Sequence, residues 1–337
     1  MPSTTTQVDL SPLGLVVGHA SDSAGATGVT VVRAPTGALR GAAAVLGRAT
    51  GTRELDALAP QHVVGRVDAI VLTGGSAYGL GCADGVMRWM EERGRGFAIG
   101  GGVVPIVPAA VIFDLGPLGA FSARPTAAMA YAACDDARAT PVAEGSVGAG
   151  TGATVGKGAG IERAMKGGVG CWVEHAPDAA VGAVAVVNAL GDVRDASGRI
   201  IAGARADDGR FVDVARALAR GELALPAEPA ARNTTLAVIG TSAPLSRLAL
   251  AQLAAAAGAA LTRRITPAGT SFDGDAIFAV TPLPERDTDL ALAPRRLLQL
   301  EVMAAEALEV AVERAVRHAV GREGIPGLAD ARGGAPA

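Results

Sequence analysis

The sequence predicts an α+β fold in which packed β-sheets are covered by helices. Short runs rich in Val and Ile alternate with Ala-rich stretches of helix length. These segments do not follow a strict βαβ repeat, which favours packed sheets over a doubly wound parallel sheet. Half of the 337 residues are hydrophobic, so the chain can form a sizeable core as one large domain or two modest ones.

In the first half of the chain, local patterns separate strands, helices and loops. The two earliest Val-rich runs are close enough to pair as neighbouring strands, and a later apolar run leads into glycines. After that run, apolar side chains recur at helical spacing. We therefore expect strands over 14–20, 28–34 and 69–75, helices over 79–93 and 123–140, and a glycine-rich loop over 145–162.

The second half contains one stretch that is typical of a linker. Residues 221–232 hold two prolines and show no periodicity. Regular patterns lie on both sides of it and end in a long amphipathic segment. We expect strands over 180–193, 234–240 and 275–282, and helices over 212–220, 244–257 and about 293–319.

Composition excludes several functional classes. The formal net charge is −3 with no basic block, and only 3% of residues are aromatic, which argues against nucleic-acid binding. The apolar run 98–113 contains Gly and Pro residues that a membrane span would tolerate poorly, and the N-terminus lacks a signal-peptide pattern. Three widely spaced cysteines form no CxxC pair. A soluble, cytoplasmic protein is expected.

The stretch "AARNTTLAVIGTS" (230–242) offers a possible self-cleavage site. The hydroxyl of Thr234 could attack the Asn233 carbonyl, convert the peptide into an ester and leave Thr234 as a new N-terminus. Its α-amine, with a reference pKa of about 8, could then act as the base for its own hydroxyl. The same residues also match a polar turn before a strand and an N-x-[ST] glycosylation pattern, and the dipeptide alone does not decide between these.

Four further residues could support such chemistry. Lys157, one of only two lysines, lies in the glycine-rich segment "TGATVGKGAG", although it could be an ordinary surface lysine. Asp273 and Asp275 precede a strand and could orient an ammonium and a hydroxyl, or simply form a turn. Asn188 lies near a strand end, where its amide could donate to an oxyanion.

Other motifs are incomplete. The loop "LTGGSAYGLG" (72–81) lacks both the GxGxxG order and the GxxxxGK[ST] lysine of nucleotide-binding loops. No GxSxG elbow is present. The four histidines are scattered without metal-ligand spacing.

Taken together and in order, five stretches resemble one known family. It comprises self-processing amidohydrolases with an N-terminal nucleophile: β-peptidyl aminopeptidases, L-aminopeptidase/D-esterases and nylon-oligomer hydrolases. The resemblance covers residues from about 12 to 320. The stretches that carry it are "GTRELDALAP" (51–60), "LTGGSAYGL" (72–80), "GAGTGATVGK" (148–157), "NTTLAVI" (233–239) and "DGDAIFAVT" (273–281).

The resemblance implies a four-layer αββα sandwich like that of N-terminal nucleophile hydrolases, with altered strand connectivity. It implies that residues 1–337 form a single domain, cut between Asn233 and Thr234 into subunits 1–233 and 234–337. It further implies assembly of the cleaved units, often as tetramers, and chemistry that uses no metal or organic cofactor.

The resemblance also assigns roles by position. Thr234 matches the nucleophile, and Lys157 the lysine that helps to hold its hydroxyl and amine. Asn188 matches the amide that stabilises the oxyanion. Asp273 and Asp275 match the acidic pair that orients the new N-terminus.

Two positions depart from the family pattern, and both concern the substrate. Phe113 stands where several relatives have a tyrosine that donates to the oxyanion, and Phe cannot donate. Val111 stands where aminopeptidase relatives have an acid that holds a substrate amine. These departures favour the amide- or oligomer-hydrolase end of the family. We place Val111, Phe113 and Tyr78 in the predicted substrate pocket.

The sequence therefore predicts a self-cleaving N-terminal threonine amidohydrolase that acts on small aliphatic amides or short peptides through an acyl-enzyme. Two alternatives remain open at this point. One is acyl transfer in the manner of ornithine acetyltransferases, which also self-cleave before a threonine. The other is a non-catalytic oligomeric binding protein with the same fold.

Overall fold

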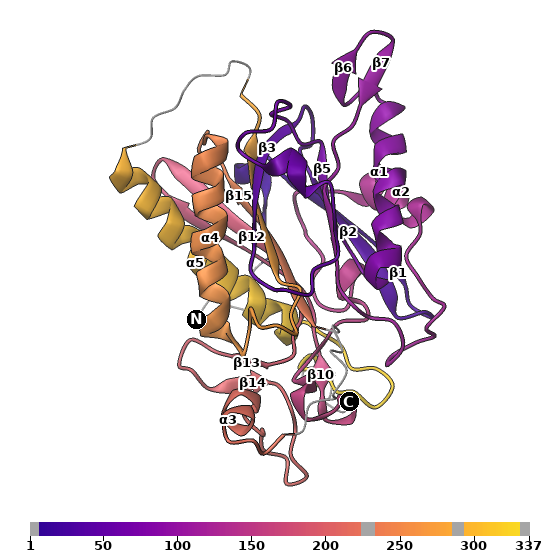
Figure 1. Ribbon diagram of the computed structural model, residues 1–337, viewed down its shortest axis with the longest axis vertical. Helices are drawn as coiled ribbons and strands as arrows, with labels where there is room; N and C mark the ends of the chain where they lie inside the picture. Colours follow the sequence, from indigo (N-terminus) through magenta and orange to yellow (C-terminus); the bar gives the residue numbers. More distant parts are fainter. Residues whose placement is uncertain (1–6, 224–232, 285–292, 331–337) are drawn as a thin grey trace.

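A computed structural model describes residues 7–223, 233–284 and 293–330. Two five-stranded sheets dominate it (Figure 1). The first has the order β1-β2-β5-β8-β4 and the second the order β11-β12-β15-β17-β3. Each is antiparallel except for one pair, β5 with β8 and β15 with β17. The first sheet comprises β1 Val16–Asp22, β2 Thr27–Arg33, β5 Ala69–Thr73, β8 Ala109–Val111 and β4 Thr52–Arg53.

The second sheet contains the Asn233–Thr234 junction at the start of β15. Its strands are β11 Gly168–Ala176, β12 Ala179–Asn188, β15 Thr234–Thr241, β17 Ala276–Pro282 and β3 Leu39–Val45. Three smaller sheets accompany the large ones among the described residues. They comprise β14 Ile200–Ala202, β13 Asp192–Arg194 and β16 Ile265–Thr266; β9 Thr154–Val155 and β10 Met165–Lys166; and β6 Phe97–Ile99 and β7 Gly102–Val104.

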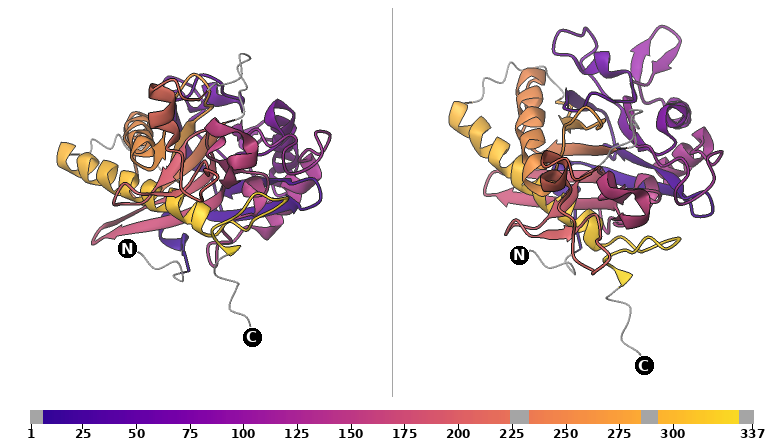
Figure 2. Two further views of the ribbon diagram at one scale, coloured as in Figure 1. Left: turned by 90° about the horizontal axis from the view of Figure 1, so that it is seen from below. Right: turned by 60° about the horizontal axis from the view of Figure 1, so that its bottom comes forward.

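Helices cover the outer faces of the two sheets. α1 Cys82–Glu91 and α2 Ala127–Asp136 lie on the first sheet, and α4 Arg247–Arg264 and α5 Pro294–Arg317 on the second, with α3 Val214–Ala219 beyond the end of the second (Figure 1). The views in Figure 2 keep the two helix pairs on opposite sides. Short 3₁₀ turns complete the fold at Ser11–Leu13, Leu55–Leu58, Ser76–Gly81, Gly148–Gly150, Lys157–Ala159 and Ile161–Arg163.

Three apolar layers hold these elements together. The middle layer joins the inner faces of the two sheets, and each outer layer joins a sheet to its helices. β15 shows why a fully buried strand is needed here, because alternate side chains enter different layers. Leu236 and Val238 face the other sheet, whereas Ala237 and Ile239 face the helices. The predicted four-layer αββα sandwich is confirmed.

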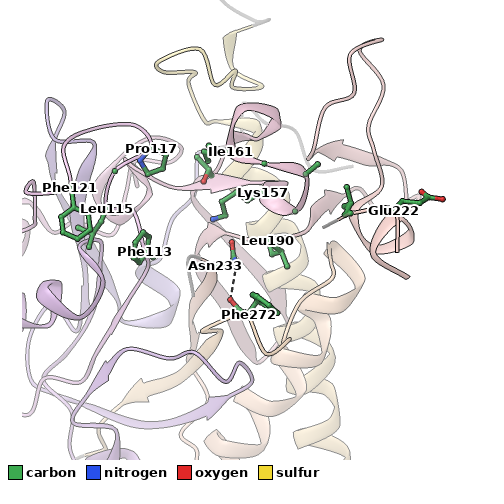
Figure 3. Close-up of a pocket in the computed structure, with 16 residues that line it drawn as sticks. Phe113, Leu115, Pro117, Phe121, Lys157, Ile161, Leu190, Glu222, Asn233 and Phe272 are labelled. Atoms are coloured by element: carbon green, nitrogen blue, oxygen red, sulfur yellow. Dashed lines mark hydrogen bonds between the residues drawn. The ribbon is translucent and has the colours of Figure 1, made fainter. Parts of the chain in front are cut away.

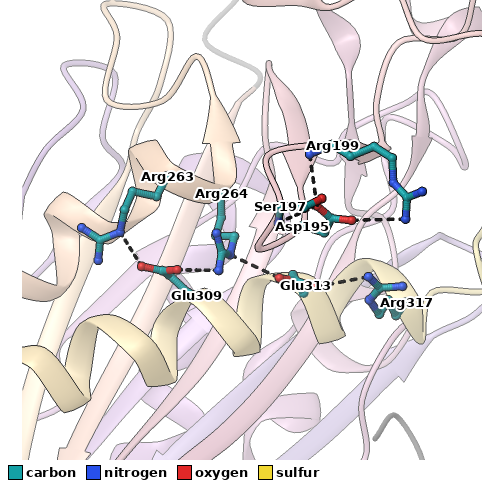
Figure 4. A network of polar contacts seen from close by, with 8 residues as sticks. All are labelled: Asp195, Ser197, Arg199, Arg263, Arg264, Glu309, Glu313 and Arg317. Atoms are coloured by element: carbon teal, nitrogen blue, oxygen red, sulfur yellow. Dashed lines mark hydrogen bonds and ion pairs between the residues drawn. The ribbon is translucent and has the colours of Figure 1, made fainter. Parts of the chain in front are cut away.

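The helices begin at residues suited to that position. Thr126 accepts a hydrogen bond from the amide of Met129 at the start of α2, and Ser246 does the same for Ala249 at α4. Ion pairs join α4 to α5, where Arg264 lies 2.6 Å from Glu309 and 3.3 Å from Glu313 (Figure 4). No helix among the described ranges is both long and apolar enough to cross a membrane.

Most predicted elements are present, with shifted ends. The helix expected over 79–93 begins with a 3₁₀ turn, and the one expected over 123–140 occupies only Ala127–Asp136. The expected loop 145–162 contains β9 and three 3₁₀ turns. Two long strands, β3 and β11, have no counterpart in the predicted elements. The linker predicted over 221–232 lies mostly outside the described residues.

Candidate active site

The Asn233–Thr234 junction lies where β12, β15 and the turn before β17 meet in the second sheet. Thr234 is the first residue of β15 and lies opposite Asn188, the last residue of β12. On the other side, Asn233 forms a parallel bridge with Asp273, just before β17. Both junction residues are buried. The sheet register therefore brings the polar ends of separate chain segments to one place.

The Asn233 carbonyl oxygen accepts two hydrogen bonds. The Thr234 hydroxyl donates to the Asn233 carbonyl oxygen across 2.6 Å, and the Gly274 amide donates to the same oxygen across 2.9 Å. Gly274 can approach this closely because it has no side chain: a Cβ there would lie 2.7 Å from the Thr234 hydroxyl oxygen. A nucleophile is thus next to a carbonyl whose oxygen already has a backbone donor.

The amide of Asn188 is held from both ends. Its Oδ1 accepts from the Thr154 amide at 3.0 Å and from the Lys157 ammonium at 2.8 Å. Its Nδ2 donates to the Phe113 carbonyl oxygen at 3.1 Å. Lys157 also donates to the Asn188 backbone carbonyl at 2.9 Å. This network fixes which end of the amide carries the donor hydrogens.

The two aspartates have different partners. Asp275 accepts from the Thr235 amide at 2.5 Å and from the Gly269 amide at 2.8 Å. Asp273 accepts from the amide of Thr270 at 2.9 Å and from its hydroxyl at 2.6 Å. Asp275 therefore contacts the residue that follows Thr234, and Asp273 secures the turn that precedes β17.

The Asp275 carboxyl has a strongly shifted pKa. Burial, followed by the neighbouring charge of Asp273, raises its pKa to about 7. The hydrogen bonds from Thr235 and Gly269 and the charge of Lys157 oppose this shift. A carboxyl with a pKa near neutral can give or take a proton at the pH of a cell.

A cavity of about 730 Å³ opens beside the junction (Figure 3). Lys157 and Asn233 lie near its middle, between Phe121 on one side and Leu190 on the other (Figure 3). The Glu222 carboxylate points away from them. Most of the wall is apolar. The lining residues are Phe113, Leu115, Gly116, Pro117, Phe121, Thr154, Lys157, Gly158, Ala159, Gly160, Ile161, Leu190, Glu222, Leu223, Asn233 and Phe272.

The three residues predicted for the substrate pocket lie in different places. Phe113 lines the cavity. Val111 is buried in β8, where its amide donates to the Gly51 carbonyl oxygen. Tyr78 is exposed on the turn before α1, and the Arg124 guanidinium carbon lies 3.4 Å from its ring centre. Neither Val111 nor Tyr78 is part of the cavity wall, so a role for them in substrate binding stays a prediction.

Two contributors to the site were missed from sequence. In the sequence Gly274 is only the spacer of the D-G-D turn, although its amide donates to the Asn233 carbonyl oxygen. Thr154 holds Asn188 through its backbone, which a side-chain pattern cannot reveal. Among the described residues, no group of three or more His, Cys, Asp or Glu side chains is placed to bind a metal ion.

Comparisons with known proteins assign this chain to a family. The model of peptidase family S58 matches residues 11–329. An uncharacterised aminopeptidase of Mycobacterium leprae is 44% identical over 339 residues, which cover 93% of this chain and 91% of that protein. A 6-aminohexanoate-oligomer endohydrolase of Kocuria is 34% identical over 281 residues, covering 80% of this chain and 73% of that protein.

Solved structures show the same fold at lower identity. A β-aminopeptidase of Burkholderia superposes with a TM-score of 0.67 at 23% identity, covering 97% of this chain and 93% of that one. The L-aminopeptidase D-Ala-esterase/amidase of Ochrobactrum anthropi, described as a variant of the Ntn-hydrolase fold, gives 0.66 at 20% identity, with 95% and 89% covered. This chain therefore belongs to peptidase family S58 and is a hydrolase of peptide or amide bonds.

Proposed function

We propose that the protein is a self-cleaving amidohydrolase whose nucleophile is the N-terminal threonine released at position 234. One observation carries the proposal: the Thr234 hydroxyl lies 2.6 Å from the Asn233 carbonyl oxygen, which also accepts from the Gly274 amide. A hydroxyl adjacent to a polarised carbonyl is the arrangement that an N-to-O acyl shift requires.

Self-cleavage begins when the Thr234 oxygen bonds to the Asn233 carbonyl carbon. The Gly274 amide stabilises the negative charge that develops on the carbonyl oxygen. The C–N bond then breaks, the nitrogen of Thr234 receives the hydroxyl proton and becomes an amine, and an ester joins the two residues. Water hydrolyses this ester, leaving a carboxylate at Asn233 and a free hydroxyl at Thr234.

The second reaction uses the amine that the first one creates. The α-amine of Thr234, with an ordinary pKa near 8, takes the proton of its own hydroxyl as the oxygen attacks a substrate amide. The Asn188 amide, oriented by Thr154 and Lys157, donates to the substrate oxyanion. Asp273 and Asp275 orient the new ammonium group. The leaving amine departs with a proton, and water releases the acid from the acyl-enzyme.

The cavity favours neutral, apolar amides as substrates. Its wall is mainly aliphatic and aromatic on both sides of Asn233, so substrate atoms can extend in two directions from the reacting carbonyl. The Phe113 ring offers no hydrogen bond, but its backbone carbonyl holds Asn188. Small aliphatic amides, short peptides and amide oligomers are the classes that we expect. The cut units are expected to associate further, as tetramers.

Mass measurement of the purified protein tests the cleavage. We expect two chains, residues 1–233 and 234–337, and a Thr234→Ala variant that stays whole and inactive. A panel of amino-acid p-nitroanilides, β-peptides and aminohexanoate oligomers then identifies the substrate. An undivided parent chain that hydrolyses amides, together with a fully active Thr234→Ala variant, would overturn the proposal.

A further inference from the structure

The second lysine of the chain is buried in β10, opposite Thr154 of β9. Lys166 is only 1% exposed, and its ammonium donates to three backbone carbonyl oxygens, those of Ala153 at 2.6 Å, Thr151 at 3.0 Å and Gly150 at 3.4 Å. A charge removed from water is costly unless it is paired and hydrogen-bonded. These bonds fix the loop that leads directly into Thr154.

A buried carboxylate approaches the same loop at Gly152. Asp114 is 3% exposed and accepts from the Gly75 amide at 2.6 Å and from the Thr27 hydroxyl at 2.7 Å. These two bonds attach the segment that contains Phe113 and Asp114 to the first sheet. The carboxylate thus fixes the position of the residue that directly follows Phe113.

The loop held by Lys166 and the segment held by Asp114 both form hydrogen bonds with the Asn188 side chain. Thr154, directly after Ala153, donates its amide to Asn188 Oδ1 at 3.0 Å. Phe113, directly before Asp114, accepts from Asn188 Nδ2 at 3.1 Å. Thr154 is also the cross-strand partner of Lys166 in the β9–β10 pair. Each end of the Asn188 amide is therefore bound by a residue next to a buried charge or its partner: Thr154 follows Ala153, which Lys166 holds, and Phe113 precedes Asp114.

The loop held by Lys166 approaches Asp114 at Gly152, and the charges of Lys166 and Asp114 influence each other. A Cβ at Gly152 would lie 2.7 Å from the Asp114 Cβ, so only glycine permits this approach. Burial lowers the pKa of Lys166 to about 7, helped by the charge of Arg322 and opposed by that of Asp114. Burial raises the pKa of Asp114 to about 6, against the charge of Lys166. Each group thus stabilises the charged form of the other.

We infer that Lys166 and Asp114 are a pair of positioning residues that set the orientation of the Asn188 amide for oxyanion stabilisation. The inference rests on the proposed function in assigning that role to Asn188. Neither charge touches the substrate; each acts through the backbone of Thr154 or Phe113. Without the pair, the Asn188 amide can rotate or shift. Stabilisation of the transition state is then lost, whereas substrate binding changes little.

A double-mutant cycle tests this pair. The variant Lys166→Met/Asp114→Asn removes both charges together, which avoids leaving one buried charge unpaired. With kcat normalised to the fraction of cut chain found by mass, we expect kcat to fall roughly tenfold to a hundredfold and KM to stay within about twofold. In an Asn188→Ala background the same two substitutions should cause almost no further loss, because the group they position is gone.

A matched control separates positioning from general stability. Arg264→Met removes a largely buried cation that pairs with Glu309 and Glu313 between α4 and α5 (Figure 4). These ion pairs involve neither Asn188 nor the groups that hold its side chain. It should lower the melting temperature without changing kcat. If the double charge variant does not fold, Asp114→Asn alone, which keeps the side-chain shape, is taken through the same cycle.

Two outcomes would overturn the inference. One is an unchanged kcat in the charge variant, and the other is an equal fold-loss in the presence and absence of Asn188, as expected of a purely structural role. Failure of the proposed function looks different. In that case Thr234→Ala would retain activity, whereas here Thr234→Ala stays inactive and only the coupling between Lys166, Asp114 and Asn188 is missing.

Discussion

The amide nitrogen of Gly274 lies 2.9 Å from the carbonyl oxygen of Asn233, on the bond proposed to break. The donor belongs to the backbone, so only substitution by proline, which lacks an N–H, would remove it. Crowding can still displace it, because a methyl group at this position would meet the Thr234 hydroxyl and the Ala49 carbonyl oxygen, each at 2.7 Å.

Gly274→Ala should therefore slow self-cleavage. A displacement of the nucleophile by about 1 Å can reduce a rate roughly a hundredfold, so we expect a slowing of at least about tenfold. A time course of intact mass after rapid purification measures it. Gly65→Ala is the control, since a Cβ at Gly65 meets nothing within 4 Å. Cleavage of Gly274→Ala at the parent rate would contradict the assigned geometry.

Thr234→Ser should preserve both reactions at reduced rates. Serine keeps the hydroxyl and, after cleavage, the α-amine, but its χ1 angle is less restricted than that of threonine. We expect cleavage and hydrolysis to be slower by about tenfold or less. Gel electrophoresis and a p-nitroanilide assay measure the two rates, and a serine variant as inert as Thr234→Ala would argue against a hydroxyl nucleophile.

Asn188→Ala should affect substrate hydrolysis more than self-cleavage. Removal of one oxyanion donor typically lowers kcat by about 10²–10³-fold. The Asn233 carbonyl oxygen already accepts from the Gly274 amide, so the first reaction retains a donor. Cleavage rate and kcat should be measured on the same preparation. Equal losses in the two reactions would show that they depend on Asn188 alike.

Asp275→Asn should change how stability depends on pH. In the uncut state the pKa of Asp275 is raised to about 7, above its ordinary value of 3.8, so the folded chain holds a proton that the unfolded chain releases. Stability from this group is thus present at low pH and is lost as the pH rises from about 4 to 7.

The measurement uses Thr234→Ala as the parent, so that the chain stays whole. Melting temperatures of Thr234→Ala and Thr234→Ala/Asp275→Asn are compared between pH 4 and pH 8. As the pH approaches neutral, the melting temperature of the asparagine variant should rise by a few degrees relative to that of its parent, because the variant has no buried carboxyl to ionise. A difference that does not vary with pH would show that Asp275 titrates normally.

Phe121→Ala should weaken substrate binding without changing the chemistry. Phe121 lines one side of the cavity and its ring is exposed, so its loss removes apolar contact that is equal in the ground and transition states. We expect KM for apolar amides to rise about threefold to tenfold with kcat unchanged. Phe97→Ala, which removes an exposed ring on β6, is the control. An unchanged KM would place the substrate on the other side of Asn233.

The sequence predicted elements whose patterns are local. β15 is a continuous apolar run after a polar junction, and the D-G-D turn stands directly before β17, so both could be recognised without knowledge of the fold. β3 and β11 could not. β3 is rich in Ala, and β11 contains Gly170, where a Cβ would lie 2.0 Å from the Ala311 carbonyl oxygen of α5. Such residues suit close helix packing but weaken the strand pattern.

The site was predictable as a set of residues but not as a network. Side-chain chemistry and the family resemblance pointed to Thr234, Lys157, Asn188, Asp273 and Asp275. The backbone donors of Gly274 and Thr154 depend on how distant segments meet, which no local pattern encodes. Val111 shows a different limit: the family resemblance assigns it to the substrate pocket, but its side chain is buried in β8 and does not line the cavity, so that assignment remains a prediction.

The strand order of the second sheet has a consequence for the life of the molecule. β15 and β17 lie between β12 and β3, so strands that follow the junction are enclosed by strands that precede it. Cleavage of the Asn233–Thr234 bond would leave two polypeptides that share one sheet. They could separate only if the pairing of β15 with β12 and of β17 with β3 were broken. Once denatured, they would have to find each other by diffusion, so refolding would become second order and sensitive to dilution. Cleavage would then be irreversible, and the lifetime of the active protein would depend on its rate of unfolding.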